Sequence, residues 1–393
     1  MKRVLQIPMF SKYFFVLIIL IFLARTDSFS QWLEDPASES HIHRGIEQIY
    51  NVEFDNARSE FQTVINAHPD HPAGYFFLAM VEWWNIMLDI DNESRDEQFI
   101  KMLDHVIDLC DKRLDKNEED LVALFFKGGS IGFRGRLYAN RSDWIKAAND
   151  GRTAMPLVQK MYKIAPNNSD VLLGMGIYNY YAAIVPEQYP MVKPVMMFFP
   201  KGDKLKGIDQ LKTTSEKGAY ANYEASYFLL QLYQNYEKRY PESLTLAEAL
   251  HKKFPNNPIF YKYLGKAQVT LGNWEEFHTI YIDILQRIKK NQFGYNEGME
   301  REAQYYLGIY EMFKNHNDDA LTRLYRCDEL SRKLDAKTAS GFMAMANLKV
   351  GMIYDLQSKR DLAIEQYKKV LQIADYMDSH KFAEEYLKIP YKK

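Results

Sequence analysis

Signatures of catalysis and of metal binding are missing from this sequence of 393 residues. It contains no HExxH, CxxC, GxSxG or GxGxxG motif, and no set of acid, base and nucleophile can be assembled from it. The histidine pairs are His41 with His43, before the first expected helix, and His68 with His71, in a turn where we expect both in solvent. The sequence therefore predicts a protein that is not an enzyme and holds no cofactor and no metal.

An excess of basic charge is also missing. The chain has 50 Lys and Arg against 52 Asp and Glu, a net charge of −2. Residues 1–30 carry four of the basic groups and one acid, so the remainder has 46 basic and 51 acidic residues. A nucleic-acid-binding surface would need clustered positive charge, so we expect no nucleic acid among the partners.

Cysteine is scarce, with Cys110 and Cys327 alone. Both lie on apolar stripes of expected helices and are far apart in an elongated helical array, whereas a disulfide needs Cα atoms within about 7 Å. We expect two buried free thiols.

Long apolar runs are limited to the N-terminus, where twelve apolar or aromatic residues extend from Tyr13 to Ala24 behind Lys2 and Arg3. A membrane-spanning helix needs about 20 residues, whereas a basic start, a short apolar run and small residues are typical of a secretory signal peptide. We expect residues 1–30 to be removed before Gln31, and the mature protein to be periplasmic or secreted. An uncleaved anchor is the alternative.

What the sequence does contain is a repeat. Gly45 is followed by apolar or small residues at offsets of 12, 16 and 19, and the same offsets recur after Gly308 and Gly351. Steps of three and four residues return to one face of a helix. A small residue at the start of each set allows two helices to approach closely. Eight such positions predict eight helical hairpins: Gly45, Ala79, Gly128, Gly176, Gln231, Gly265, Gly308 and Gly351, of which Gln231 alone is not small.

These spacings resemble the tetratricopeptide repeat, a helix-turn-helix unit of 34 residues. The stretches FFKGGSIGFRGRLYA, KAANDGR and LLGMGIYNYYAA are similar to a bacterial secreted subfamily and, more distantly, to eukaryotic Iml-type proteins of the outer mitochondrial membrane. The resemblance implies an all-α superhelical solenoid with an interaction role and without catalytic residues. We expect a linker at 31–42, the array at 43–378 and a C-terminal capping segment at 379–393.

Two stretches depart from the repeat. In the first, four glycines are mixed with Arg134 and Arg136. This composition could hold a phosphate, and both arginines are candidate partner-binding residues that line the groove. The stretch lacks the ending of a P-loop, so we favour close helix packing with the arginines paired to acids. The second is a proline-rich apolar insertion at 182–201, inside the fourth hairpin. Prolines forbid a continuous helix there, and the apolar side chains must be covered.

We expect the open concave face of the array to cover the apolar side chains of this insertion. We expect Tyr178, Tyr181, Tyr189 and Phe198 to pack together and line the groove, with Tyr180 beside them. The function predicted is that of an exported scaffold or adaptor that binds a protein or peptide, for which membrane contact is allowed but not required. The alternative is a small-ligand or lipid-binding protein whose pocket is formed by Tyr178, Tyr180 and Tyr181.

Overall fold

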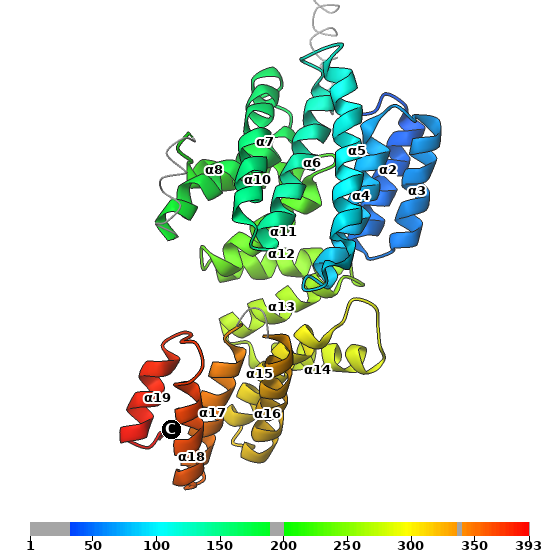
Figure 1. Cartoon of the computed structure of the whole chain (residues 1–393). Coiled ribbons are helices and arrows are strands. Elements are labelled where there is room, and N and C mark those ends of the chain that lie inside the picture. Colours follow the sequence, from blue (N-terminus) through cyan, green and yellow to red (C-terminus); the bar gives the residue numbers. More distant parts are fainter. Residues whose placement is uncertain (1–31, 189–199, 336–339, 393) are drawn as a thin grey trace, which may run out of the picture.

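A computed structural model describes residues 32–188, 200–335 and 340–392, and these residues form seventeen α-helices, one 3₁₀ turn and no strand. Consecutive helices pack in antiparallel pairs, and the pairs follow one another along a curved array (Figure 1). The eight pairs are α2 (Pro36–Tyr50) with α3 (Phe54–Ala67), α4 (Pro72–Leu88) with α5 (Asp96–Leu114), α6 (Leu121–Asn140) with α7 (Trp144–Ile164), α8 (Val171–Gln188) with α10 (Lys204–Lys217), α11 (Asn222–Asn235) with α12 (Tyr240–Lys253), α13 (Pro258–Leu271) with α14 (Trp274–Lys289), α15 (Glu297–Phe313) with α16 (Asn317–Leu334), and α17 (Phe342–Leu356) with α18 (Arg360–Val370).

The predicted fold class is confirmed, because the eight hairpins contain the eight predicted positions, one in the first helix of each. A single helix, α19 (Ser379–Lys388), follows the eight hairpins. It packs against α17 and α18 and ends the array. The η1 turn (Glu93–Arg95) lies between α4 and α5. No helix in the described ranges has the combination of length and apolarity that a membrane crossing requires.

Helix ends are set by local sequence. Proline stands two residues after the last residue of α3, α7 and α12, where it cannot continue the helix. At the other end, Asp35 accepts hydrogen bonds from the backbone N–H groups of Ala37 and Ser38, and Pro36 occupies the first position of α2. Asp and Asn side chains cap several further helices in the same way. Local residues therefore determine where these helices begin.

The small positions lie where paired helices approach most closely. A Cβ atom added at Gly308 would be 2.8 Å from Cγ of Leu324 in α16, and one at Gly351 would be 2.5 Å from the Tyr367 ring in α18. Gly45 and Gly176 are similarly tight, the nearest atom to an added Cβ at Gly265 would be at 3.1 Å, and Ala79 has no exposed surface. At Gly128 the nearest atom would be at an ordinary 3.4 Å, so the size limit there is weaker.

We therefore expect Gly308→Leu to destabilise the protein by about 1–3 kcal/mol or more, because overpacking forces neighbouring side chains out of their rotamers. Thermal and urea unfolding measure the effect. Gly132→Leu on α6 is the matched control, since a Cβ atom there would meet nothing within 4 Å. Equal stability of the two variants would show that helices α15 and α16 do not meet at Gly308.

The array closes on itself over its first six hairpins, and the start of α15 joins this closure. The hydroxyl of Tyr50 in α2 donates to Glu224 in α11 (2.8 Å), and Asn257, the N-cap of α13, donates to the backbone carbonyl of Tyr50 (2.8 Å). Asn296, which caps α15, likewise donates to the carbonyl of Leu88 at the end of α4 (2.8 Å). The first and second hairpins thus contact hairpins that are distant in sequence.

Aromatic rings of the chain itself fill the inside of this closed turn. Trp84 packs against Tyr227 (5.4 Å between centroids) and Phe260 (5.7 Å), and Phe77 against Tyr220 (5.2 Å). One buried cluster extends from Trp32 to Tyr310. The open concave face expected from the sequence is therefore absent from this part of the molecule, because side chains of the first helices meet across it.

Residues 32–42 of the predicted linker belong to the fold. Trp32 and Leu33 are 2% and 4% exposed, and α2 already begins at Pro36. The Trp32 ring stacks on Phe125 (4.1 Å, 20°), and its Nε1 donates to Asp170 (2.7 Å). This segment is short, and polar residues surround Trp32 in the sequence. No helical periodicity of apolar residues therefore predicted these contacts.

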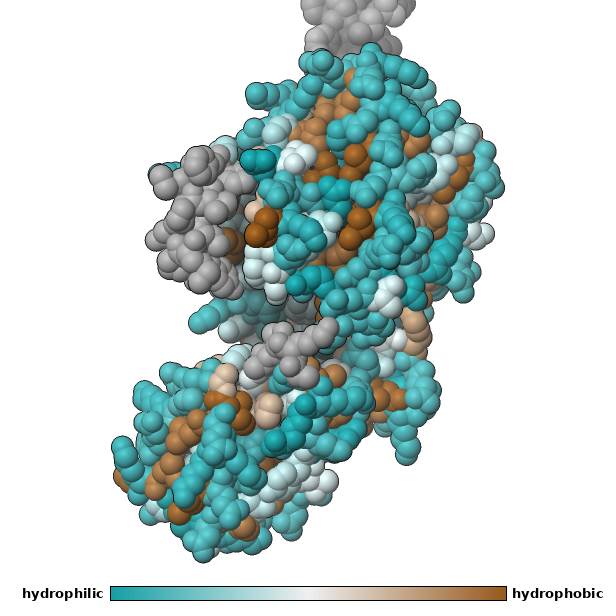
Figure 2. Space-filling model, in the orientation of Figure 1, coloured by the Kyte–Doolittle hydropathy of each residue, from teal (hydrophilic) through white to brown (hydrophobic). Residues whose placement is uncertain are grey.

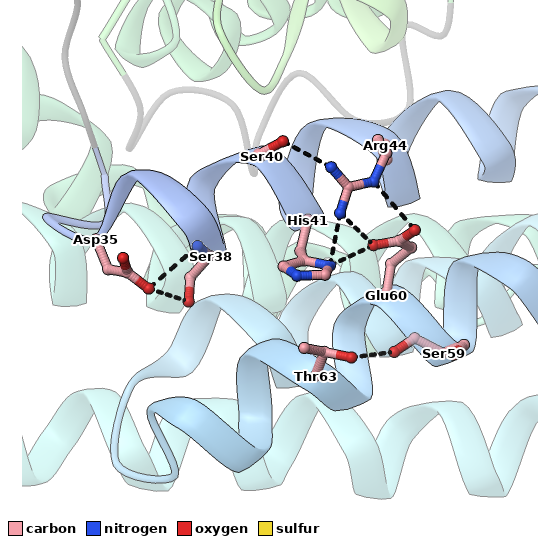
Figure 3. A network of polar contacts seen from close by, with 8 residues as sticks. All are labelled: Asp35, Ser38, Ser40, His41, Arg44, Ser59, Glu60 and Thr63. Carbon is pink, nitrogen blue, oxygen red and sulfur yellow. Dashed lines mark hydrogen bonds and ion pairs between the residues drawn. The ribbon is translucent and has the colours of Figure 1, made fainter.

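The histidine pairs of the sequence are tied to other groups. His41 and Arg44 of α2 both bind Glu60 of α3, which joins the two helices of the first hairpin (Figure 3). His43 instead lies 3.4 Å from Glu39. His71 is half-buried rather than solvated: it accepts a hydrogen bond from the N–H of Ala73, and burial lowers its pKa to about 4. None of these contacts brings two histidines to a common point.

Both cysteines are free and buried, Cys110 in the large cluster and Cys327 in a separate cluster of the C-terminal hairpins. Burial raises the pKa of each thiol to about 12. Since the thiolate is the reactive form, we expect neither thiol of the native protein to react with Ellman's reagent at pH 8, and two to react after denaturation. Rapid reaction of the native protein would contradict this packing.

Candidate functional site

Partly exposed tyrosines occur on four consecutive hairpins, on helices α8, α13 and α15 and at the C-cap of α11. We call this set the tyrosine surface: Tyr181, Tyr236, Tyr263, Tyr305 and Tyr306. Helix α13 lies between the part of the molecule built from α2–α12 and the part built from α15–α19 (Figure 1). Figure 2 shows the molecule hollowed between these two parts, on the left of the view.

The surface begins with Tyr181 in the middle of α8 and Tyr236 at the C-cap of α11. Tyr181 meets Tyr236 edge to face, with 6.2 Å between ring centroids, and the buried Tyr180 packs behind both at 5.4 and 6.3 Å. Edge-to-face pairs of this kind add stability beyond the area that they bury. The buried Tyr180 ring thus supports the rings of Tyr181 and Tyr236.

Helix α13 continues the surface with Tyr263 and Lys266. Tyr263 packs on the buried Tyr227 (6.0 Å), and the Lys266 ammonium lies 6.0 Å from the Tyr263 ring and donates to Oδ1 of Asn235 (3.2 Å). Lys266 is half-buried, and its pKa is lowered by burial, against the opposing effect of Glu302. This ammonium is held on the surface by an amide and an aromatic ring.

Helices α15 and α17 complete the surface. Tyr306 stacks on Tyr281 (5.4 Å, 25°), Tyr305 contacts Tyr306 (5.2 Å), and Phe342 of α17 contacts Tyr305 (5.4 Å). The hydroxyl of Tyr281 donates to Glu302 (2.9 Å). The rings of α13, α15 and α17 are therefore rigidly placed, each supported by a neighbour.

The electrostatics of the surface follow from partial burial. Burial raises the pKa of Tyr263 to about 12 and raises the pKa values of Tyr181, Tyr305 and Tyr306 further. These hydroxyls stay neutral at physiological pH and remain hydrogen-bond donors. The surface offers flat rings, neutral hydroxyl groups, one ammonium and one carboxylate, which suits recognition of a polypeptide.

The tyrosines predicted from the sequence are separated by the structure. Tyr180 has no exposed surface and donates to Glu237 (2.7 Å), so it supports the tyrosine surface without lining it. Tyr178 donates to the carbonyl of Pro200 and packs against the large cluster, whereas Tyr181 packs with the cluster around Tyr180. Tyr178 and Tyr181 therefore contact different clusters and do not form the common group that we predicted.

Tyr189 and Phe198 lie outside the described residues, so their predicted contacts stay predictions. The predicted insertion at 182–201 begins differently from our expectation. Residues 182–188 continue α8, with Pro186 inside the helix near its end. A proline inside a helix removes one backbone hydrogen bond, and α8 extends only two residues beyond Pro186.

The arginines of the glycine-rich stretch are paired with acids. Arg134 binds Asp150 (2.7 Å) and also Asp104 of α5, and Arg136 binds Glu224 (2.7 Å). The Arg136 guanidinium also lies over the rings of Trp83 (5.0 Å) and Phe228 (4.5 Å). Both arginines hold helices together in the structure, so neither is placed as a partner-binding group.

The tyrosine surface contains residues that sequence reasoning missed, although a signal was present. Tyr263 and Tyr306 stand two residues before the packing glycines Gly265 and Gly308, and Lys349 has the same offset from Gly351. Residues at one repeat position face the same side of successive hairpins. Comparing the residues two positions before each packing glycine would therefore have identified the side of the array that carries the tyrosine surface.

Two hollows in the described residues lie elsewhere. One, of about 340 Å³, is lined mainly by apolar side chains of α4 and α5, including Tyr75, Leu78 and Met102. The other, of about 660 Å³, is polar and lies on α15 and α16. Neither is lined by the tyrosines on which the small-ligand alternative depends.

Comparison with models of protein families and with curated proteins gave no match. Among solved structures, a tetratricopeptide repeat protein from Parabacteroides merdae ATCC 43184 is similar, with 12% identity over 79% of this chain and 99% of that chain and a TM-score of 0.34. Yeast Tom70 is also similar, with 12% identity over 90% of this chain and 96% of that chain and a TM-score of 0.27. Superpositions at this level carry no argument about function, and the description as a tetratricopeptide-like array depends on the hairpins described above.

Proposed function

We propose that this protein is an exported, non-catalytic scaffold that binds a segment of a partner protein on the tyrosine surface. The observation that carries the proposal is the series of partly exposed tyrosines on α8, α13 and α15 and at the C-cap of α11. Tyrosine gives a large contact area at a low cost in side-chain entropy and is enriched at protein interfaces. The buried rings behind it, such as Tyr180 and Tyr281, hold the surface in one conformation before a partner binds.

Photo-crosslinking in the native cell tests this proposal. A benzophenone amino acid at position 263 or 306 is expected to crosslink to the same partner, identified by mass spectrometry. Position 362 on α18 is the control, since Leu362 is partly exposed there but far along the array. No crosslink at 263 and 306, or the same products at 362, would count against the tyrosine surface.

Export is the second part of the proposal and has its own test. Trp32 already belongs to the core, so cleavage before Gln31 would remove none of the residues that make these contacts. We expect fractionation of the native host to place the protein in the periplasm or medium, and N-terminal sequencing to start at or near Gln31. An intact N-terminus that resists a high-salt wash of the membrane would instead indicate an anchor.

A further inference from the structure

A histidine and two carboxylates gather at the turn between α15 and α16, away from the residues of the tyrosine surface. Glu311 is in the last turns of α15, His316 caps α16, and Asp319 is in its first turn. One potential ligand atom of each side chain lies within 4.8 Å of the others. Glu311 is half-buried, while His316 and Asp319 are exposed to water.

We propose that these three side chains bind a divalent transition-metal ion of the zinc type. One imidazole nitrogen and two carboxylate oxygens are a common ligand set for such ions, with bonds of about 2.0–2.2 Å. Ligand atoms around one ion are then roughly 3–4 Å apart, so the exposed side chains must close by only about 1 Å. Solvent reaches the turn and can supply the remaining ligands.

The geometry already includes part of the support that such a site needs. Nδ1 of His316 lies 2.9 Å from Oε2 of Glu311, so two of the proposed ligands already face each other. Glu311 and Asp319 also line the polar hollow of about 660 Å³, which leaves room for water ligands or for a ligand from another molecule. The ligand set spans two helices of one hairpin, so a bound ion would fix the α15–α16 turn.

Two positive charges oppose a cation here. The N-terminus of α16 carries partial positive charge, which Asp318 and Asp319 in its first turn offset. The Arg323 guanidinium lies 4.0 Å from Oε1 of Glu311. Removing that positive charge by Arg323→Gln is expected to strengthen metal binding.

Isothermal titration of the tag-free mature protein, residues 31–393, with zinc chloride is the test. We expect one saturable site per chain, and binding at least about tenfold weaker in His316→Ala and in Asp319→Asn. His105→Ala is the matched control, because this exposed histidine of α5 lies outside the cluster.

The changed side chains are exposed, and far-ultraviolet circular dichroism will show whether each variant keeps its helices. If one variant is unfolded, the other still gives the comparison. Absence of saturable zinc binding, or an affinity that neither His316→Ala nor Asp319→Asn changes, would overturn the proposal. Neither result bears on the partner-binding surface, since crosslinking at 263 and 306 is measured independently.

Discussion

Replacing Trp32 by alanine is expected to lower the free energy of unfolding of the mature protein by about 3–5 kcal/mol, the usual cost of deleting a large buried aromatic side chain. The ring is 2% exposed and stacks on Phe125, so its loss leaves a cavity where α6 meets the N-terminus. It also removes the Nε1 donor from Asp170, a carboxylate that is 2% exposed. A buried acceptor without its partner adds to the cost.

Urea unfolding followed by far-ultraviolet circular dichroism measures this effect. Trp144→Ala is the control, because Trp144 is also a tryptophan but is 67% exposed at the start of α7. We expect the control to change stability by less than about 0.5 kcal/mol, as surface substitutions usually do. If the two variants were equally stable, residues 32–35 would be a linker after all.

The second large effect is expected from Arg136→Met. Glu224 is almost fully buried and is bound by Arg136 and by the Tyr50 hydroxyl. Removing the guanidinium leaves a buried carboxylate without a counter-charge, which typically costs about 3–5 kcal/mol. The methionine keeps much of the packing against Trp83 and Phe228, so the measured loss reports mainly on the charge.

A double variant separates the charge from the packing. In Arg136→Met with Glu224→Gln the carboxylate is neutral, and we expect most of the lost stability to return. Arg332→Met is the control, since Arg332 pairs with Asp328 on the exposed face of α16 and such pairs contribute about 0–1 kcal/mol. A loss in Arg136→Met that the second substitution does not reduce would show that Arg136 acts through its contacts with Trp83 and Phe228.

The candidate site could be predicted only in part. The sequence pointed to the tyrosines of α8, because they stand beside an unusual apolar stretch. Of these, Tyr181 is on the tyrosine surface, whereas Tyr180 is wholly buried behind it. The helical periodicity of the sequence could not show which of Tyr180 and Tyr181 is buried. In a helix that is covered on most sides, adjacent residues are equally apolar.

The hairpin array was determined by the sequence itself. A glycine such as Gly308 or Gly351 must lie where helices meet, the prolines after α3, α7 and α12 end those helices, and Asp35 or Asn257 can cap the next. These are local properties, which depend on backbone sterics and on hydrogen bonds between residues close in the chain, and they require no knowledge of the rest of the molecule.

Only the tertiary structure decided that the array closes over its first six hairpins, that Trp32 belongs to its core, and which tyrosines remain exposed. The first two depend on residues more than a hundred positions apart, such as Tyr50 with Glu224 or Trp32 with Asp170. The third depends on contacts between neighbouring hairpins, such as that of Tyr181 with Tyr236. The path of a solenoid is the sum of small rotations from hairpin to hairpin. The repeat pattern gives the period of the hairpins but not these rotations, so it cannot tell an open groove from a filled one.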